Sequence, residues 1–533
     1  GTAGCVLANR LSSSEYTVLV LEAGDSTPDD LLDVRIPLFN SKLKNTSVDW
    51  KLKSTYQNNA NDRDIGVPLG KLLGGSSAFN ACIAHRCSPS DYDVWGAPEW
   101  TYETLKPYFR KAETFHDTNS VSQELHGTTG PFHISQTRTE NGPIGTYFRA
   151  VCRKLGLPEY DDMTDLPCQI GVTGLQASIY QGERITTAST YITKEIEQQR
   201  SNLFVALGCK VTRVLLEDQR VTHVEYLAND VIYTVAVERE AILSAGAILS
   251  PLLLLSSGIG PQEELGSLGI DTLVHLPGVG KNLQNHWRVP LVHETKHADM
   301  SLHAGIFKHQ KESLDRALQQ KDGPLTQLWP DVVAYMKIPD APDNSSSREN
   351  TPQIELFAGG LALCRELSHL KEVDCATLLM VLIAPFSRGS VRLSDDKSPL
   401  IDFGLLQDKR DLECLEKGLQ LSMSIAKDPE YENNCVKQWI KYPEDEHDSR
   451  TLHQYIKENI DTLHHYAGTC KMGLKQDESA VVDHHLRVHG IQGLRVVDAS
   501  FFPTVPAGQT CFPVIACAER ASDLILQDNQ IQF

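Results

Sequence analysis

The sequence has no hydrophobic run long enough to cross a membrane as a helix. Its most apolar stretch, ILSPLLLLSSGIG, covers only residues 248–260 and contains Pro251, whereas a spanning helix needs about 20 apolar residues. Basic residues are in deficit, with 50 Lys and Arg against 69 Asp and Glu and a formal net charge of −19. This balance argues against nucleic acid and anionic membrane surfaces as main partners.

Metal-binding patterns are absent as well. The 13 cysteines are spread thinly and include no C-x-x-C pair or other spacing typical of metal ligands, so we predict buried thiols and no metal site. The composition, with 41% hydrophobic and 22% charged residues, is that of an ordinary globular protein. Because 533 residues are too many for one compact core, we expect about two domains.

The chain lacks the strand and the first glycine of a complete dinucleotide-binding fingerprint. That fingerprint reads G-x-G-x-x-G between a strand and a helix, and Gly1 and Gly4 occupy the places of its second and third glycines. A helix is expected over residues 5–14, and the strand YTVLVLEAG then reaches Glu22, 18 residues beyond Gly4. An acid at about this distance accepts hydrogen bonds from a ribose hydroxyl, and the helix N-terminus favours a pyrophosphate.

A second glycine-rich segment, GKLLGGSSAFNACIAHRCSPSDYDVWG, covers residues 70–96. Its paired glycines allow the backbone to approach a flat or anionic ligand closely, and the serines supply short hydrogen-bonding groups. The segment resembles the G-K-x-L-G-G-S-S-x-x-N, R-G and D-Y-D-x-W patterns of the glucose–methanol–choline (GMC) oxidoreductases, which bind FAD. Cys87 stands where that family usually has glycine. The matching residues are Gly70, Lys71, Gly74, Gly75, Ser76, Ser77, Asn80, Arg86, Asp91, Tyr92, Asp93 and Trp95.

Further segments resemble the same family along the whole chain. LSAGAILSPLLLLSSGIGP (243–261) is similar to its second signature, and LPGVGKNLQNHW (276–287) resembles V-G-x-N-L-Q-D-H with Asn285 in place of the aspartate. HHYAGTCKMG (464–473) resembles H-x-x-G-T-C-x-M-G, and residues 481–525 follow the family pattern almost throughout. Residues 290–460 carry few motifs, which is typical of a substrate domain.

This resemblance implies an α/β fold. We expect a doubly wound, Rossmann-like FAD-binding domain and a substrate domain in which helices flank an antiparallel sheet. We predict that residues 1–95, 200–290 and 465–533 form the first domain, and that residues 96–199 and 291–464 form the second. The residues that the resemblance assigns to FAD are Gly1, Thr2, Ala3, Gly4, Glu22, Ala23, Leu73, Gly74, Gly75, Ser76, Asn80, Ala81, Val211, Asp498, Ala499, Gln509, Thr510 and Cys511.

The resemblance also implies a reaction on a small-molecule alcohol. In the family, a base removes the hydroxyl proton while a hydride passes from carbon to N5 of the flavin. A neutral imidazole suits the proton step because its pKa lies near the operating pH. His465 occupies the family's position, three residues before Gly468. His464 is adjacent, and neighbours in an extended segment point in opposite directions, so we expect only His465 to face the flavin.

The second catalytic position, usually Asn or His in the family, is Gln509 in this chain. A glutamine amide can donate a hydrogen bond to an alkoxide and accept one from a hydroxyl, but it cannot titrate. We therefore expect Gln509 to orient the substrate oxygen while His465 carries the proton. The G-Q-T loop also resembles that of the fatty-acid photodecarboxylases, a light-driven branch of the family, but those enzymes lack a histidine in the register of His465.

Two other functions stay open on the sequence. Some GMC relatives catalyse lyase or cyclase reactions without net redox change, and a group of histidines could supply acid–base groups for such chemistry. A flavin-free paralogue with a binding or scaffold role is the second alternative. Cys470 is expected to be structural because the sequence places no base beside it. The histidines are His464, His465, His484, His485 and His489, of which the last three are expected at the surface.

Several FAD-binding segments survive besides the half fingerprint. We therefore interpret the sequence as clipped upstream of Gly1, because a chain without the central strand of its sheet would leave unpaired edges. No signal peptide is visible, and both a cytoplasmic and a secreted location stay open. The sequence points to no particular oligomeric state.

Overall fold

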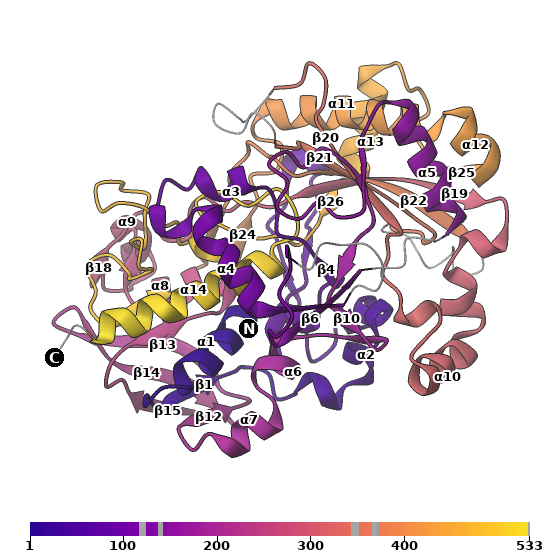
Figure 1. The fold of residues 1–533 in the computed structure, drawn as a ribbon. Helices are drawn as coiled ribbons and strands as arrows, with labels where there is room; N and C mark the ends of the chain where they lie inside the picture. Colours follow the sequence, from indigo (N-terminus) through magenta and orange to yellow (C-terminus); the bar gives the residue numbers. More distant parts are fainter. Residues whose placement is uncertain (117–123, 137–141, 343–350, 365–369, 371–372, 531–533) are drawn as a thin grey trace.

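The computed structural model describes residues 1–116, 124–136, 142–342, 351–364, 370 and 373–530. Within them the chain forms two α/β lobes (Figure 1). One lobe contains both chain ends and the helices α1 (Thr2–Ser12), α8 (Gly246–Ser256) and α14 (Cys511–Gln530). The other is built on a large sheet with helices around it. None of the described helices is both long and apolar enough to span a bilayer.

Two parallel strand pairs form the sheet of the first lobe. β1 (Val18–Leu21) pairs with β12 (Leu203–Ala206), and β16 (Ala241–Leu243) pairs with β27 (Leu494–Val496). No described strand joins β1 to β16, and residues of both strands line the same cavity. The pairs are therefore the two halves of the expected doubly wound sheet, with no described strand at its centre.

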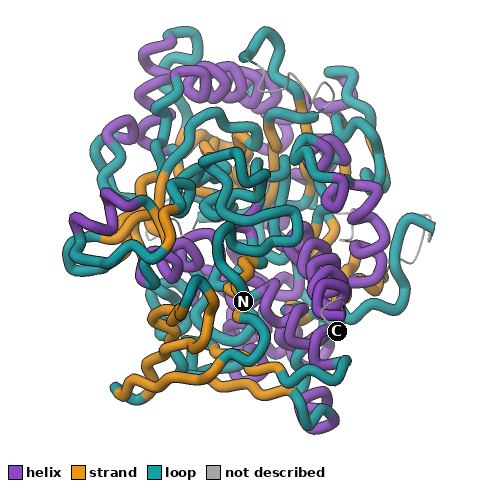
Figure 2. The backbone as a smooth tube through the Cα atoms, turned by 90° about the vertical axis from the view of Figure 1, so that its left-hand side faces the viewer, coloured by secondary structure: helices purple, strands orange, loops and turns teal. Residues whose placement is uncertain are grey.

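Helices and a small antiparallel sheet pack around these pairs. α1 packs against α14 and α6 (Thr187–Tyr191), and α14 packs against α4 (Tyr102–Ala112). The contact between α1 and α14 places the first and last described helices of the chain side by side, in the lower half of the view in Figure 2. The antiparallel sheet consists of β13 (Lys210–Glu217), β14 (Arg220–Ala228) and β15 (Val231–Ala236).

The second lobe contains an eight-stranded sheet in the order β25–β19–β22–β21–β20–β8–β7, with β26 added on β19. All its pairs are antiparallel except β7–β8. Helices α5 (Pro143–Lys154), α11 (Lys409–Ala426) and α13 (Ser449–Asn459) contact it. The strands are β7 (Glu159–Tyr160), β8 (Gly171–Thr173), β19 (Trp287–Thr295), β20 (Val332–Met336), β21 (Ile354–Gly359), β22 (Cys375–Leu382), β25 (Val436–Lys441) and β26 (Asp461–Thr462).

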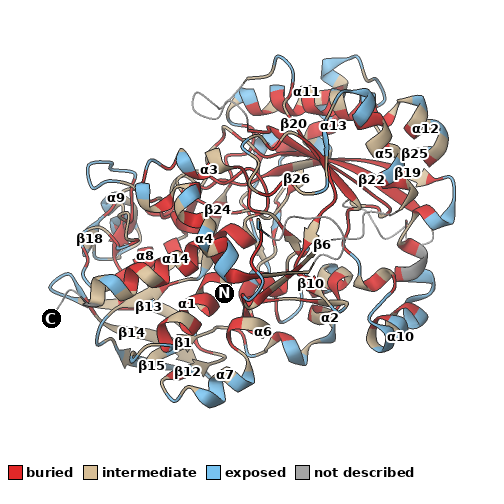
Figure 3. Ribbon diagram, viewed as in Figure 1, coloured by how far each residue is buried: buried red, intermediate tan, exposed pale blue. Residues whose placement is uncertain are grey.

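The centre of this sheet is covered on both faces. Every residue of β20, β21 and β22 is buried (Figure 3), which explains why these strands read as continuous apolar runs. Alternate side chains divide between two clusters. One face, including Leu356 and Met380, joins the main core, while the other, including Phe357 and Leu379, joins a second cluster and lines the cavity.

Shorter elements connect the two lobes and complete the surface. A four-stranded sheet has the order β4–β9–β6–β5. The remaining elements named here are α2 (Leu32–Arg35), α3 (Pro89–Asp93), α7 (Lys194–Gln199), α9 (Gln262–Ser267), α10 (Gln310–Gln320), α12 (Pro429–Cys435), β2 (Leu52–Lys53), β3 (Gly66–Val67), β4 (Ile83–Ala84), β5 (Glu113–His116), β6 (Phe132–Gln136), β9 (Gln176–Ala177), β10 (Ile179–Tyr180), β11 (Glu183–Arg184), β17 (Ile259–Gly260), β18 (Val274–His275), β23 (Ser390–Leu393), β24 (Pro399–Asp402) and η4 (Gly75–Ala78).

Candidate active site

A cavity of about 2690 Å³ is lined by residues of both lobes. It extends into the gap between β1 and β16, so its volume includes more than a ligand site. Of the residues that the sequence assigns to FAD, all but Leu73 and Gly74 line this cavity, and so does His465. Leu73 is buried in the main core, and a Cβ on Gly74 would contact Ala188 instead. Segments from both ends of the chain therefore meet around one space.

The two glycine-rich segments touch at the start of α1. A Cβ on Gly75 would lie 2.7 Å from the Cα of Gly1, and Gly75 has a φ of +53°, so this position needs glycine for both space and backbone conformation. Gly1 is the N-cap of α1. No side chain caps this helix N-terminus, and Thr2, Ala3 and Gly4 of its first turn line the cavity, as an anion-binding helix N-terminus requires.

Ser244, after β16, adds a polar group to this place. Its Oγ is buried and has no hydrogen-bond partner within the described residues, and its Cβ lies 3.4 Å from where a Cβ on Gly4 would stand. Because buried polar atoms normally have a partner, this hydroxyl indicates a missing ligand at the N-terminus of α1. The donor set fits the pyrophosphate of a dinucleotide such as FAD.

Two carboxylates lie on the same cavity. Glu22 follows β1 and accepts a hydrogen bond from Gly24 N–H at 2.8 Å, and burial raises its pKa. Asp498 follows β27 and accepts hydrogen bonds from Gly246 N–H at 2.8 Å and Ser250 Oγ at 2.5 Å. Asp498 thereby ties the start of α8 to the C-terminal segment. Glu22 stands at the end of its strand, where a ribose-binding acid is expected.

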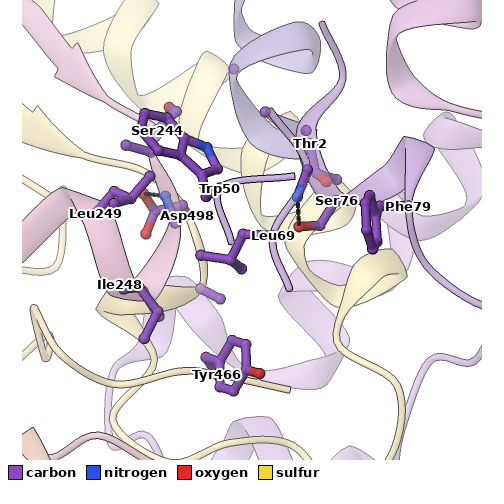
Figure 4. Close-up of a pocket in the computed structure, with 18 of the residues that line it drawn as sticks. Thr2, Trp50, Leu69, Ser76, Phe79, Ser244, Ile248, Leu249, Tyr466 and Asp498 are labelled. Atoms are coloured by element: carbon purple, nitrogen blue, oxygen red, sulfur yellow. Dashed lines mark hydrogen bonds between the residues drawn. The ribbon is translucent and has the colours of Figure 1, made fainter. Parts of the chain in front are cut away.

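Figure 4 shows how these segments surround the pocket. Thr2 and Ser76 lie on one side of the view, while Ser244 and Asp498 lie on another. Trp50 and Leu69, from a segment that the sequence analysis did not single out, also line the space. Flat apolar side chains beside polar backbone groups suit a ligand that combines aromatic rings with phosphates.

His465 lies on the cavity wall and contacts a second histidine. The Nδ1 atoms of His465 and His286 are 2.9 Å apart, and the rings meet edge to face. Burial lowers the pKa of His465 to about 3, so its imidazole is neutral at pH 7. His286 is fully buried directly before β19. The sequence analysis missed it, although it lies inside the quoted segment LPGVGKNLQNHW.

The adjacent histidines do not have the extended backbone that the sequence analysis assumed beside the cavity. His464 and His465 both line it, because His464 has a φ of +67° and the segment is not extended there. Asn285 Oδ1 accepts a hydrogen bond from His465 N–H at 2.9 Å, and His464 Nδ1 lies 3.0 Å from Tyr466 Oη. Burial, followed by the charge of Lys44, lowers the pKa of His464 well below its usual value.

Gln509 is buried and lines the same cavity, and its side-chain amide is hydrogen-bonded to Glu355. Its Nε2 donates to both carboxylate oxygens of Glu355 at 3.2 Å, while its Oε1 has no partner within the described residues. Glu355 lies fully buried on β21, and burial raises its pKa to about 8. A single glutamate in the otherwise apolar strand IELFAG is the sequence feature that could have identified this residue.

The other three histidines named in the sequence analysis, and Cys470, lie outside the cavity. His484, His485 and His489 do not line the cavity; His485 Nδ1 instead lies 3.0 Å from Asp528, and His489 Nε2 lies 3.0 Å from Gly473 O. Burial raises the pKa of the Cys470 thiol, which keeps it protonated and a poor nucleophile. A histidine-rich lyase site of the kind considered above would therefore keep only His464 and His465.

The chain is similar to known proteins over its whole length. Residues 1–288 and 385–518 match the N-terminal and C-terminal family models described as GMC oxidoreductase. An oxygen-dependent choline dehydrogenase from Vibrio vulnificus (strain YJ016) is 32% identical, with 100% of this chain and 94% of the relative covered. A chloroplastic fatty acid photodecarboxylase from Chlamydomonas reinhardtii is also 32% identical, with 98% and 89% covered.

Solved structures give the same result. A formate oxidase variant from Aspergillus oryzae RIB40, studied for modification of its FAD, is 25% identical, with a TM-score of 0.91 and 100% and 98% of the two chains covered. These matches span both lobes, the glycine-rich segments and the segment of His465. The chain therefore belongs to the GMC oxidoreductases and is an FAD-dependent enzyme of that family.

Proposed function

We propose that the protein oxidises an alcohol, with His465 as the base and Gln509 as the residue that orients the hydroxyl. One observation carries this proposal: the neutral imidazole of His465, whose Nδ1 contacts His286, lines the same cavity as the first turn of α1. Relatives whose names include choline dehydrogenase and ecdysone oxidase support the reaction class. When bound, FAD supplies the acceptor for the two electrons and the hydrogen that leave the carbinol carbon.

The contact between His286 and His465 sets the tautomer that proton removal needs. Only one of the two Nδ1 atoms can donate in a hydrogen bond between neutral rings. When His465 Nδ1–H donates to His286, the lone pair of His465 Nε2 is available to take the hydroxyl proton. Burial disfavours the imidazolium until a negative charge lies beside it, so protonation of His465 is coupled to the developing alkoxide.

Gln509 offers one end of its amide to the substrate. Because Nε2 is held by Glu355, Oε1 is the atom left to accept a hydrogen bond from the substrate hydroxyl. This contact holds the hydroxyl on the cavity before reaction; because an alcohol has a single hydroxyl hydrogen, that hydrogen must turn from Gln509 Oε1 to His465 Nε2 for His465 to remove the proton. Glu355 acts through Gln509 and is therefore a positioning residue.

We propose the domain division that the sequence predicts. Residues 1–95, 200–290 and 465–533 would form the FAD-binding domain, and residues 96–199 and 291–464 the substrate domain. The parallel strand pairs and the contact between α1 and α14 support the first domain, and the eight-stranded sheet supports the second. The FAD-binding residues would be the cavity-lining set described above.

A spectrum of the purified protein tests the proposal. We expect flavin absorption that is lost when an alcohol is added without oxygen. Protein without flavin absorption, and unable to bind added FAD, would favour the flavin-free paralogue. A bound flavin that no alcohol in a broad screen reduces would favour lyase or cyclase chemistry.

A further inference from the structure

The cavity wall beside the two proposed catalytic residues is apolar. Leu463 and Ala507, each two residues before a catalytic position, belong to the second hydrophobic cluster. Further side chains of this cluster also line the cavity, among them Leu38, Leu328, Trp329, Phe357, Leu361, Leu363 and Leu379. Ile306 and Phe307 extend the same lining. We call these cavity-lining residues, with Leu463, the apolar wall.

The sheet itself supplies part of the apolar wall. Phe357 on β21 and Leu379 on β22 are directly paired in the antiparallel register and are each 1% exposed. Trp329 lies 6.5 Å from Phe357 between ring centroids. Because Phe357 and Leu379 are fixed in the sheet and almost fully buried, they support the wall from behind and make it rigid. The partly exposed wall residues Leu38, Leu361 and Leu363 supply surface against which a long apolar group can be buried.

Two cations, Arg288 and Lys44, act on His464, the neighbour of His465 on the cavity. Arg288 follows His286 by two residues, so the two side chains share a face of the chain as it enters β19. Arg288 Nη2 lies 3.1 Å from Asp461 Oδ2, so the Asp461 carboxylate is already engaged in a salt bridge. Lys44 lines the same cavity. Asp49 also lines the cavity, but three backbone N–H groups already donate to it. A substrate ammonium would therefore meet two cations and two carboxylates that already have partners, which disfavours its binding.

Polyhydroxylated substrates are disfavoured for a different reason. Each hydroxyl placed against an apolar wall loses its hydrogen bonds to water without replacement. Polar groups within this lining include Gln327, the Nε1 atom of Trp329 and His303, and His303 Nε2 is already 3.2 Å from Ala362 N–H. An apolar chain, in contrast, gains free energy for each methylene that it buries.

We propose that the substrate is an uncharged alcohol with a large apolar body, such as a long-chain alcohol, and that the enzyme discriminates against amino alcohols and sugars. This inference rests on the proposed alcohol oxidation. It assigns the apolar wall to the body of the substrate and assigns Arg288 to the exclusion of cations.

A chain-length series with the holoenzyme tests the apolar wall. For primary alcohols from 1-butanol to 1-decanol we expect kcat/KM to rise by about fourfold per methylene until the wall is covered. Choline and glucose should be poorer substrates than 1-decanol. A flat series, or a preference for choline or glucose, would overturn the inference while leaving alcohol oxidation intact.

A binding measurement separates this inference from the proposed reaction. The tertiary alcohol 2-methyl-2-decanol has no hydrogen on its carbinol carbon, so it can bind but cannot be oxidised. We expect it to raise the Tm of the holoenzyme, whereas 2-methyl-2-propanol at the same concentration should not. If no alcohol reduces the flavin but this difference remains, the reaction is wrong and the apolar site stands. If the difference is absent, the apolar site is wrong.

Two variants test the assigned residues. Leu361→Gln should lower kcat/KM for 1-decanol by about tenfold and leave 1-butanol almost unchanged. Leu474→Gln, at a residue that is 63% exposed and outside the cavity, is the matched control. Arg288→Gln leaves Asp461 unpaired and should raise kcat/KM for choline by about tenfold relative to 1-decanol. Equal effects on all substrates would show that these residues affect folding rather than selection.

Discussion

The Nδ1 atoms of His286 and His465 lie 2.9 Å apart, with their ring planes at 79°. The two residues are separated by 179 positions in the sequence and are brought together where β19 begins next to β26. A hydrogen bond between the two Nδ1 atoms requires one of them to donate and the other to accept. His286 therefore controls which nitrogen of His465 can accept a proton from the cavity.

Replacing His286 should slow proton removal. His286→Leu leaves His465 Nδ1 without its partner, so we expect the rate of flavin reduction to fall by about tenfold or more. His286→Gln, whose amide oxygen can accept from His465 Nδ1–H, should retain more of the rate. Stopped-flow reduction by an alcohol without oxygen measures both variants. Equal rates in His286→Leu and the unmodified protein would exclude the proposed control of the tautomer.

Removing the base itself should have a larger effect. His465→Ala should lower the rate of flavin reduction by about 10²–10⁴-fold, which is the usual contribution of one general base. His489→Ala is the control, because that histidine does not line the cavity. FAD content should stay unchanged in both variants, as judged from the absorbance ratio. A normal reduction rate in His465→Ala would remove this residue from the mechanism.

Glu355 should make stability depend on pH. Burial raises its pKa to about 8 in the folded protein, against about 4.3 for an unperturbed glutamate. Between these values the folded protein binds more protons than the unfolded chain, so the free energy of unfolding falls as pH rises. In Glu355→Gln this contribution is absent, and we expect a smaller loss of Tm between pH 5 and pH 8. Glu478→Gln, at an exposed position, should keep the original profile; an unchanged profile in Glu355→Gln would refute the assignment.

The contact between the two glycine-rich segments should be needed for FAD binding. Gly75→Ala places a Cβ 2.7 Å from the Cα of Gly1 at a φ of +53°, so we expect loss of bound FAD or loss of the folded protein. Gly266→Ala is the control, because a Cβ there meets no atom within 4 Å and the residue lies in α9. Flavin absorbance and circular dichroism distinguish the two losses. Full FAD occupancy in Gly75→Ala would place the cofactor elsewhere.

Much of the cofactor site could be predicted from the sequence because it is made of local backbone motifs. Gly75 has a left-handed backbone conformation that few other residues can adopt, Gly1 and Gly4 stand at fixed spacing at the start of α1, and Glu22 stands at a set distance along one helix and strand. Such features leave a pattern in neighbouring residues. The register of His465 before Gly468 is readable for the same reason, and the fold class followed from these motifs through the family resemblance.

The orientation of neighbouring residues was less predictable. The expectation for His464 assumed an extended backbone, and the left-handed φ of +67° places both histidines on the cavity instead. A single dihedral angle reverses which way a side chain points. Tertiary contacts set that angle here, since Thr462 Oγ1 accepts a hydrogen bond from His464 N–H at 2.8 Å and Asn285 holds His465.

The sequence by itself determined the family, and it predicts the FAD-binding segments and the position of the base, because these depend on residue types at short and regular spacings. Only the tertiary structure decided which groups act on them. Glu355 lies 154 positions from Gln509, and Arg288 lies 173 positions from Asp461. The pKa of Glu355 and the pairing of Arg288 with Asp461 depend on burial and on neighbours from other strands. No local pattern encodes which strands will be adjacent in the sheet.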